Sequence, residues 1–161
     1  MEQTMLEAMM SRKSIRSYTD QMVSDADIEK VLKAGQYAAN GRGRMATKFV
    51  VVKNREIRDE LSKMNADIMG TTNDPFYGAP VILAVLADKT VPTYIYDGSL
   101  VLGNMLNAAE SLGLGSIWIH RAKEEFELPL GQEILKNLEI EGEYEGIGFC
   151  ALGYKNKETP K

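Results

Sequence analysis

The feature that most constrains the fold of this chain is an uninterrupted apolar run from Val81 to Ala87. Side chains of a β-strand alternate between the two faces of its sheet. A strand that is apolar at every position must therefore be covered on both faces, as central strands are. The run predicts a central strand of a sheet that is packed between two other layers.

Seven further segments have recognisable patterns. Short β-branched or apolar runs predict strands at 48–52, 116–119 and 146–153. Apolar residues recurring every three or four positions predict helices at 5–10, 24–37, 54–69 and 96–112. A chain of 161 residues without a linker or repeat suits one domain, residues 1–161. The expected fold class is α+β, three-layered around one sheet.

Two helix ends carry specific signals. Ser24 and Asp27 resemble a capping box, in which the Ser24 hydroxyl accepts from a first-turn amide and Asp27 reaches back. Gly113-Leu114-Gly115 predicts the end of the preceding helix rather than a dinucleotide fingerprint, since the third glycine is missing. The helix at 96–112 is apolar on nearly all sides, which indicates a core element, an interface element or both.

Charge and cysteine content exclude several classes. A formal net charge of -4 and a pI near 5.1 argue against a general nucleic-acid surface. Glu2 and Glu7 interrupt the methionines of the first residues, so we expect neither a signal peptide nor a membrane span. The single cysteine, Cys150, lies in an apolar run and predicts a buried thiol. A reducing, cytoplasmic location is expected.

Metal and triad chemistry lack the necessary side chains. The chain has one histidine, His120, and one cysteine, whereas zinc and most transition metals require several nitrogen or sulfur ligands. We therefore predict no metal site and no serine or cysteine triad. His120 follows a strand-like run and is interpreted as a structural residue rather than an acid or base.

Two cationic segments point to an anion. The motif Arg12-Lys13-Ser14-Ile15-Arg16-Ser17-Tyr18 follows the first predicted helix, and its cations and hydroxyls are the donors that bind phosphate. A solvated basic loop is the alternative interpretation. In Gly41-Arg42-Gly43-Arg44, glycine would let the backbone approach a ligand. Together they favour an organic cofactor that carries a phosphate and supplies its own chemistry.

The order of several segments is more specific than any one of them. They are Arg12 to Tyr18, Phe49 to Val52, Ala79 to Ile82, Gly113 to Arg121, and Ala151 to Tyr154. In this order the chain resembles the nitroreductase family of FMN-dependent oxidoreductases, over nearly its whole length. The resemblance implies a three-layer sandwich with a central, mostly antiparallel sheet, in an entwined homodimer with flavin sites at the interface.

The resemblance also implies an activity. NADH or NADPH would be the electron donor, and a nitroaromatic, quinone or related small organic molecule would be the acceptor, reduced by ping-pong hydride transfer. No nucleic acid or membrane partner is implied. The flavin carries the chemistry, so no side chain is assigned a catalytic role.

Family site residues carry over to three places in this chain. The basic motif would hold the flavin phosphate and ribityl chain, and a loop from the partner subunit would reach the same site. Backbone groups after Gly115 would meet the N5 and O4 edge of the isoalloxazine, and a basic residue near the carboxyl end would touch the phosphate. The corresponding residues are Arg12, Lys13, Ser14 and Arg16; Asn40, Gly41 and Arg42; Trp118, Ile119, His120 and Arg121; and Lys161.

Departures from the family pattern keep alternatives open. Ala39, Gly43 and Met45 replace the usual proline, asparagine and glutamine, and Ala46-Thr47 replaces a Pro-Trp pair. A flavin-binding or interaction protein with little turnover, another reductive chemistry, and a homodimer without a ligand are the alternatives. The chain ends at Lys161, so we expect part of the family's carboxyl-terminal tail to be missing.

Overall fold

A computed structural model describes residues 4–157. Its sheet has the order β1-β2-β4-β3, with β1 (Thr47–Val52), β2 (Val81–Asp88), β3 (Gly115–Ile119) and β4 (Tyr144–Gly153). All three pairings are antiparallel, and β2 and β4 lie at the centre. The central position predicted for the apolar run is confirmed, because every residue from Val81 to Ala87 is fully buried.

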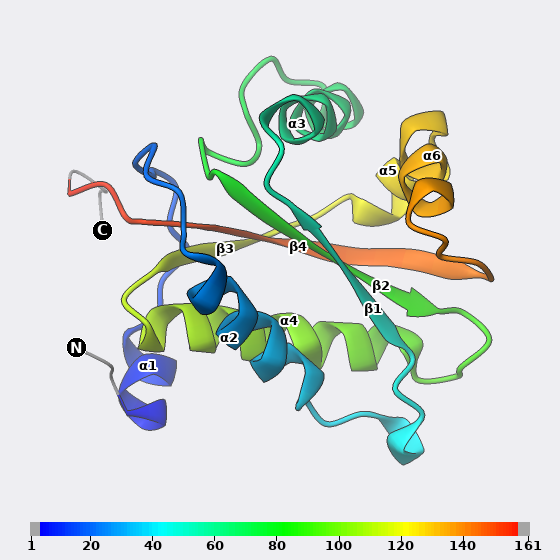
Figure 1. The fold of residues 1–161 in the computed structure, drawn as a ribbon, viewed down its shortest axis with the longest axis horizontal. Coiled ribbons are helices and arrows are strands. Elements are labelled where there is room, and N and C mark those ends of the chain that lie inside the picture. The colour runs from blue at the N-terminus through cyan, green and yellow to red at the C-terminus, as the bar shows by residue number, and fades with distance from the viewer. Residues whose placement is uncertain (1–3, 158–161) are drawn as a thin grey trace.

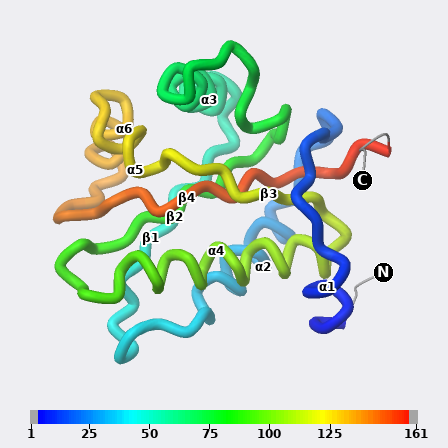
Figure 2. Tube along the Cα trace, turned by 180° about the vertical axis from the view of Figure 1, so that it is seen from behind, coloured from blue at the N-terminus to red at the C-terminus, as the bar shows by residue number. Residues whose placement is uncertain are grey.

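Helices cover both faces of this sheet (Figures 1 and 2). One face carries α2 (Asp25–Gln36) and α4 (Tyr94–Ser111), and α1 (Met5–Ser11) packs on α4. The other carries α3 (Arg55–Met69), α5 (Ala122–Glu127) and α6 (Pro129–Asn137). Side chains of β2 alternate between the two cores: Ile82 and Ala84 pack with the α3 side, and Leu83 and Val85 with the α4 side. The predicted three-layer α+β class is confirmed.

The long helix α4 is both a core element and an exposed apolar surface. Leu102 and Met105 are fully buried, whereas Tyr96 is 71% and Leu100 50% exposed. The short helix α1 is more exposed still, with Met10 at 79%. Folded monomers seldom leave this much apolar side chain in water unless it is used for binding.

Helix ends follow the expected signals with one difference. The Ser24 hydroxyl accepts from the Asp27 N–H at 3.2 Å, as predicted. The Asp27 carboxylate, however, lies 3.6 Å from Lys30 Nζ, one helical turn away, so the reciprocal half of the predicted capping box is replaced by an ion pair. Gly113, with φ of 77°, follows the end of α4 as predicted, because glycine adopts this left-handed conformation without strain.

Two helices, α5 and α6, were not predicted from the sequence. They occupy residues between β3 and β4 and are only 6 and 9 residues long. Helices of this length form through packing rather than intrinsic propensity. Here Phe126 is buried beside Phe149 of β4, with ring centroids 6.1 Å apart. None of the helices between residues 4 and 157 is long and apolar enough to cross a membrane.

A buried arginine fixes the segment between α3 and β2. Arg58 is 3% exposed, and its guanidinium binds the Asp74 carboxylate and donates to the Ala79 carbonyl at 3.0 Å. The same guanidinium lies over the Phe76 ring, 5.5 Å from its centroid. A buried charge is tolerated only when it is paired and hydrogen-bonded, and this one is both.

Arg58→Leu should lower the free energy of unfolding by about 3 kcal/mol, because it leaves the partly buried Asp74 carboxylate without its counter-ion. Urea denaturation measures this change. Arg55→Leu is the matched control on the same helix, where the exposed ion pair with Asp59 should contribute no more than about 0.5 kcal/mol. Equal losses in the two variants would contradict the role given to Arg58.

Candidate functional site

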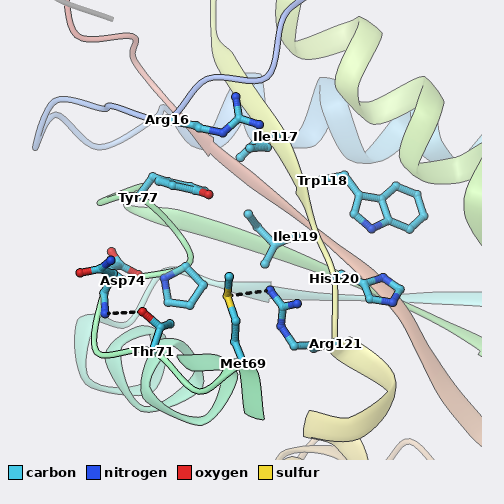
Figure 3. Close-up of a pocket in the computed structure, with 12 residues that line it drawn as sticks. Arg16, Met69, Thr71, Asp74, Tyr77, Ile117, Trp118, Ile119, His120 and Arg121 are labelled. Carbon is cyan, nitrogen blue, oxygen red and sulfur yellow. Dashed lines mark hydrogen bonds between the residues drawn. The ribbon is translucent and has the colours of Figure 1, made fainter. Parts of the chain in front are cut away.

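A pocket of about 280 Å³ opens where β3 ends (Figure 3). Three segments form it: the amino-terminal basic motif, the segment after α3, and the end of β3 with the residues that follow. Its lining residues are Arg16, Met69, Thr71, Asn73, Asp74, Pro75, Tyr77, Ile117, Trp118, Ile119, His120 and Arg121. The tertiary structure therefore joins two of the segments predicted from the sequence, one hundred residues apart.

The basic motif reaches the pocket because it runs along the edge of β3. Ser14 forms an isolated parallel bridge with Ser116, and the Ile15 N–H donates to the Ser116 carbonyl at 3.0 Å. Ile15 and Tyr18 are buried and anchor this extended segment. Arg16, between them, stays exposed and lies 6.0 Å from the Tyr77 ring centroid across the pocket.

The other predicted donors of the motif lie beside this segment. Arg12 ends α1 and is half-buried, whereas Lys13 and Ser14 are exposed. A parallel backbone bridge to Ser116 places Ser14 next to β3. The basic motif is thus an extended segment along the edge of β3, with Lys13 and Arg16 exposed.

The end of β3 presents different groups on its two sides. Ile117 and Ile119 pack into the core on the α3 side, while Trp118 packs with the α4 side, next to Leu102 and Gly148. In Figure 3 the indole points away from the centre of the pocket. Trp118 is therefore placed to contribute its backbone, which is the contribution that the family resemblance implies.

His120 and Arg121 follow the last strand residue and turn the chain toward α5. His120 is exposed and lies just beyond the strand at the rim of the pocket, with its imidazole on the Trp118 side of the segment (Figure 3). Arg121 has φ of 72°, the left-handed conformation that is unfavourable for residues with a β-carbon. Its Nε donates to Asn65 Oδ1 at 2.9 Å, and Nη2 lies 3.4 Å from Met69 Sδ.

The charge of the pocket is set by two arginines. The Asp74 carboxylate also lines the pocket. It accepts hydrogen bonds from the Arg58 guanidinium, the Ser62 hydroxyl and the N–H groups of Phe76 and Gly78. Partial burial would raise the pKa of Asp74, but these hydrogen bonds together lower it. Arg16 and Arg121 remain directed at the pocket, which favours an anionic ligand.

A buried carboxyl group lies behind Arg121. Glu125 is fully buried, and burial raises its pKa to about 8 against the opposing effects of the Asn65 hydrogen bond and the Arg121 charge. Asn65 Nδ2 donates to Glu125 Oε2 at 2.7 Å, while Glu125 Oε1 has no hydrogen-bond partner. Burial thus favours the protonated, neutral form of this acid near pH 7.

The predicted loop residues Asn40, Gly41 and Arg42 lie elsewhere. They belong to the segment around η1 (Gly41–Gly43), at the opposite end of the chain's fold from the amino-terminal edge (Figure 1). Asn40 borders an open groove of about 1050 Å³ beside β1, and Gly41 and Arg42 border a small cleft of about 170 Å³ with Arg44. One chain alone does not bring this loop to the pocket.

The position of this loop is set by a buried aspartate. Asp97 of α4 accepts from the Gly41 N–H and the Thr93 hydroxyl, both at 2.9 Å. A β-carbon on Gly41 would collide with the Thr93 hydroxyl, so glycine is required for this close approach. Asn40 Oδ1 accepts from the Met45 N–H at 3.2 Å, so its amide stabilises the loop itself. Met45 and Gly43, two of the positions that depart from the family pattern, both have left-handed backbone conformations, with φ of 52° and 65°.

Lys161 lies outside the described residues. A different lysine, Lys155, lies next to the basic motif. Its backbone forms an isolated antiparallel β-bridge with Tyr18, and its Nζ lies 2.8 Å from the Glu110 carboxylate.

Cys150 is buried, as predicted. Within residues 4–157 no group of three or more His, Cys, Asp or Glu side chains could hold a metal ion.

Sequence reasoning missed the polar residues that support the pocket. Asn65 and Asp74 carry its hydrogen-bond networks, and Tyr77 and Met69 form its wall. One signal was available for Asn65: it lies one turn after Leu61 on the apolar stripe of the predicted helix, where a polar side chain needs a partner. Nothing in the sequence indicated which residues those partners would be.

The fold and the pocket together define a class: an α+β sandwich whose site combines a cationic edge segment with the exposed backbone at a strand end. Comparison with known proteins agrees with this class. The profile of the nitroreductase family matches residues 9–72. A candidate NADH dehydrogenase/NAD(P)H nitroreductase of Archaeoglobus fulgidus is 34% identical over 161 residues, which cover 95% of this chain and 86% of that protein.

Solved structures of nitroreductases have the same fold. The nitroreductase of Bacteroides fragilis with bound FMN has a TM-score of 0.89 at 25% identity, over 99% of this chain and 92% of that one. The FMN-bound nitroreductase of Desulfitobacterium hafniense has a TM-score of 0.86 at 25% identity, over 99% and 93%. This chain belongs to the nitroreductase family and is a nitroreductase-like oxidoreductase.

Glu125→Gln should stabilise the protein at alkaline pH. Folded Glu125 keeps its proton up to about pH 8, whereas an unfolded glutamate loses it near its ordinary pKa of 4.5. The folded state binds more protons between these values, so wild-type stability should fall as the pH rises from about 4.5 through 8. Glutamine has no such proton to lose.

Thermal unfolding measured from pH 5 to 9 tests this expectation. The midpoint of Glu125→Gln should exceed that of the wild type by roughly 3 °C or more at pH 8.5, and the difference should shrink toward pH 5. Glu127→Gln, on the exposed side of α5 where Glu127 pairs with Lys123, is the control. A constant difference across the pH range would argue against a neutral Glu125.

Proposed function

We propose that this protein is an FMN-dependent NAD(P)H oxidoreductase that reduces small organic acceptors such as nitroaromatics and quinones. The observation that carries the proposal is the meeting of Arg16 with the residues His120 and Arg121 in one pocket, although the two segments are far apart in the chain. An FMN reductase [NAD(P)H] of Bacillus subtilis, 24% identical over 84% of this chain and 59% of that protein, is consistent with it.

The donors present fit FMN. Arg12, Lys13, Ser14 and Arg16 would hold its phosphate and ribityl chain, since arginine and lysine are the usual phosphate partners. The backbone of Trp118, Ile119, His120 and Arg121 would lie along the isoalloxazine edge, with the Arg121 guanidinium nearby. Fixed donors and a positive charge at that edge favour an electron-rich ring.

Bound FMN supplies two-electron transfer between a nicotinamide and an organic acceptor. The protein contributes binding, orientation and electrostatics. Because one flavin would carry the electrons from the nicotinamide to the acceptor, the two would react with it in turn, as in a ping-pong reaction. No side chain at the pocket is assigned a covalent role.

The complete site requires a second copy of the chain. Asn40, Gly41 and Arg42 lie away from the pocket of their own chain, and α1 and α4 carry exposed apolar side chains. We infer a homodimer in which the loop of one subunit completes the site of the other. The buried thiol of Cys150 suits the reducing cytoplasm.

Purified protein should bind FMN with one flavin per chain, and the flavin should be bleached by NADH or NADPH under anaerobic conditions. Absorbance spectra during FMN titration and then nucleotide addition measure both. A quinone or nitroaromatic should restore the yellow colour. Failure to bind FMN overturns the proposal, and flavin that binds but stays yellow with both nucleotides would favour a flavin-binding protein with little turnover.

The double variant Arg12→Ala with Arg16→Ala should weaken FMN binding on the order of 100-fold, because it removes two charged hydrogen-bond donors from the phosphate site. Fluorescence titration of FMN measures the dissociation constant, and circular dichroism checks the fold. Lys63→Ala with Lys136→Ala is the control: it removes the same charge from exposed positions of α3 and α6, outside the proposed site, and should leave the dissociation constant unchanged. An unchanged dissociation constant in the first variant would exclude the motif as the phosphate site.

A further inference from the structure

We propose that Asn65 and Glu125 are positioning residues that fix the His120–Arg121 segment at the pocket, and that the charge state of Glu125 controls the affinity of this site for FMN. The inference rests on the proposed function, since FMN is the anion whose binding it concerns. Neither residue lines the pocket; each acts through the residues that do.

Asn65 uses its amide fully and in one orientation. Nδ2 donates to the His120 carbonyl at 2.9 Å and to Glu125 Oε2 at 2.7 Å, while Oδ1 accepts from Arg121 Nε at 2.9 Å. A side-chain amide has two donor hydrogens and one acceptor oxygen, so these contacts satisfy it. Rotating the amide by half a turn would place its oxygen against the His120 carbonyl and its NH₂ against the Arg121 Nε–H donor. Asn65 therefore fixes both the backbone of His120 and the direction of the Arg121 guanidinium.

The backbone at Arg121 needs this support. A residue with a β-carbon in the left-handed region costs about 1 kcal/mol or more and persists where its surroundings hold it. Arg121 is held on two sides: Asn65 of α3 binds its side chain, and its carbonyl accepts from the Glu125 N–H at 3.1 Å in the first turn of α5. The backbone turn and the side-chain network thus depend on the same two residues.

Glu125 is where this network can change its charge. It has no exposed surface, and Oε1 is unpartnered. The charged groups that act on it are Arg121, which attracts the carboxylate, and Glu124, which repels it. From α3 it meets the neutral amide of Asn65, and Gly131 of α6 packs closely against its backbone without a side chain.

Losing the Glu125 proton would change what Arg121 offers to a ligand. While Glu125 is neutral, it carries no negative charge that would offset the Arg121 guanidinium charge at the pocket. A carboxylate in the same buried network would offset that charge, and a site of low dielectric makes the effect larger than it would be in water. FMN carries a phosphate and binds as an anion, so its affinity should fall as the pH rises through about 8, the pKa of Glu125.

The test compares FMN dissociation constants of intact wild-type protein, Glu125→Gln and Asn65→Leu between pH 6.5 and 9.5. Glutamine keeps an oxygen for the Asn65 donor but cannot ionise. The ratio of wild-type to Glu125→Gln dissociation constants should be near one at pH 6.5 and rise several-fold by pH 9.5. Taking the ratio cancels ionisations that both proteins share, such as that of the flavin. Asn65→Leu should weaken binding about tenfold at every pH, because the Arg121 and His120 contacts are lost.

Lys63→Ala is the matched control on α3, where Lys63 is exposed and pairs with Asp67. Parallel wild-type and Glu125→Gln curves overturn the control by Glu125, and Asn65→Leu within twofold of the wild type overturns the positioning role. If Asn65→Leu fails to fold by circular dichroism, the Glu125→Gln ratio still decides. A wild type that binds no FMN overturns the proposed function instead, which separates the two failures.

Discussion

The structure depends on the burial of β2. Its backbone is paired on both sides, with β1 and β4, and its side chains are apolar in both directions. Such a strand is stable only if each face of the sheet is covered, so α2 and α4 pack on one side and α3, α5 and α6 on the other. This arrangement places the end of β3 and the segment after α3 side by side on the α3 face, which is where the pocket forms.

Buried polar side chains then fix the positions of loops that apolar packing alone leaves undetermined. Arg58 holds the segment that includes Asp74 and Tyr77 against α3, Asn65 holds the turn at His120 and Arg121, and Asp97 holds Gly41. Each is a buried side chain that satisfies backbone groups of a loop. Since an unsatisfied buried group is costly, these contacts define single loop positions where apolar packing would allow several.

The division of the binding groups between the two ends of the fold has a functional consequence. The cationic edge with Arg16 and the turn at Arg121 are complete within one chain, but the η1 loop is directed elsewhere. Exposed apolar residues of α4 lie beyond the core that the same helix helps to form. The proposed flavin site, shared between two copies of the chain, would account for both observations and would couple cofactor binding to dimerisation.

Periodicity and composition by themselves determined the class, the central strand, helices α1 to α4, the other three strands and the cationic motif. These are local patterns whose physical requirements do not depend on distant residues. The order of the family motifs predicted that the carboxyl-terminal end of β3 and the basic motif belong to one site. Only the tertiary structure decided that α5 and α6 exist, that His120 is exposed, and that Asn65 joins Glu125 to Arg121. Those outcomes depend on which side chains meet across the fold, and a hydrogen-bond partner sixty residues away leaves no periodic signal in the sequence.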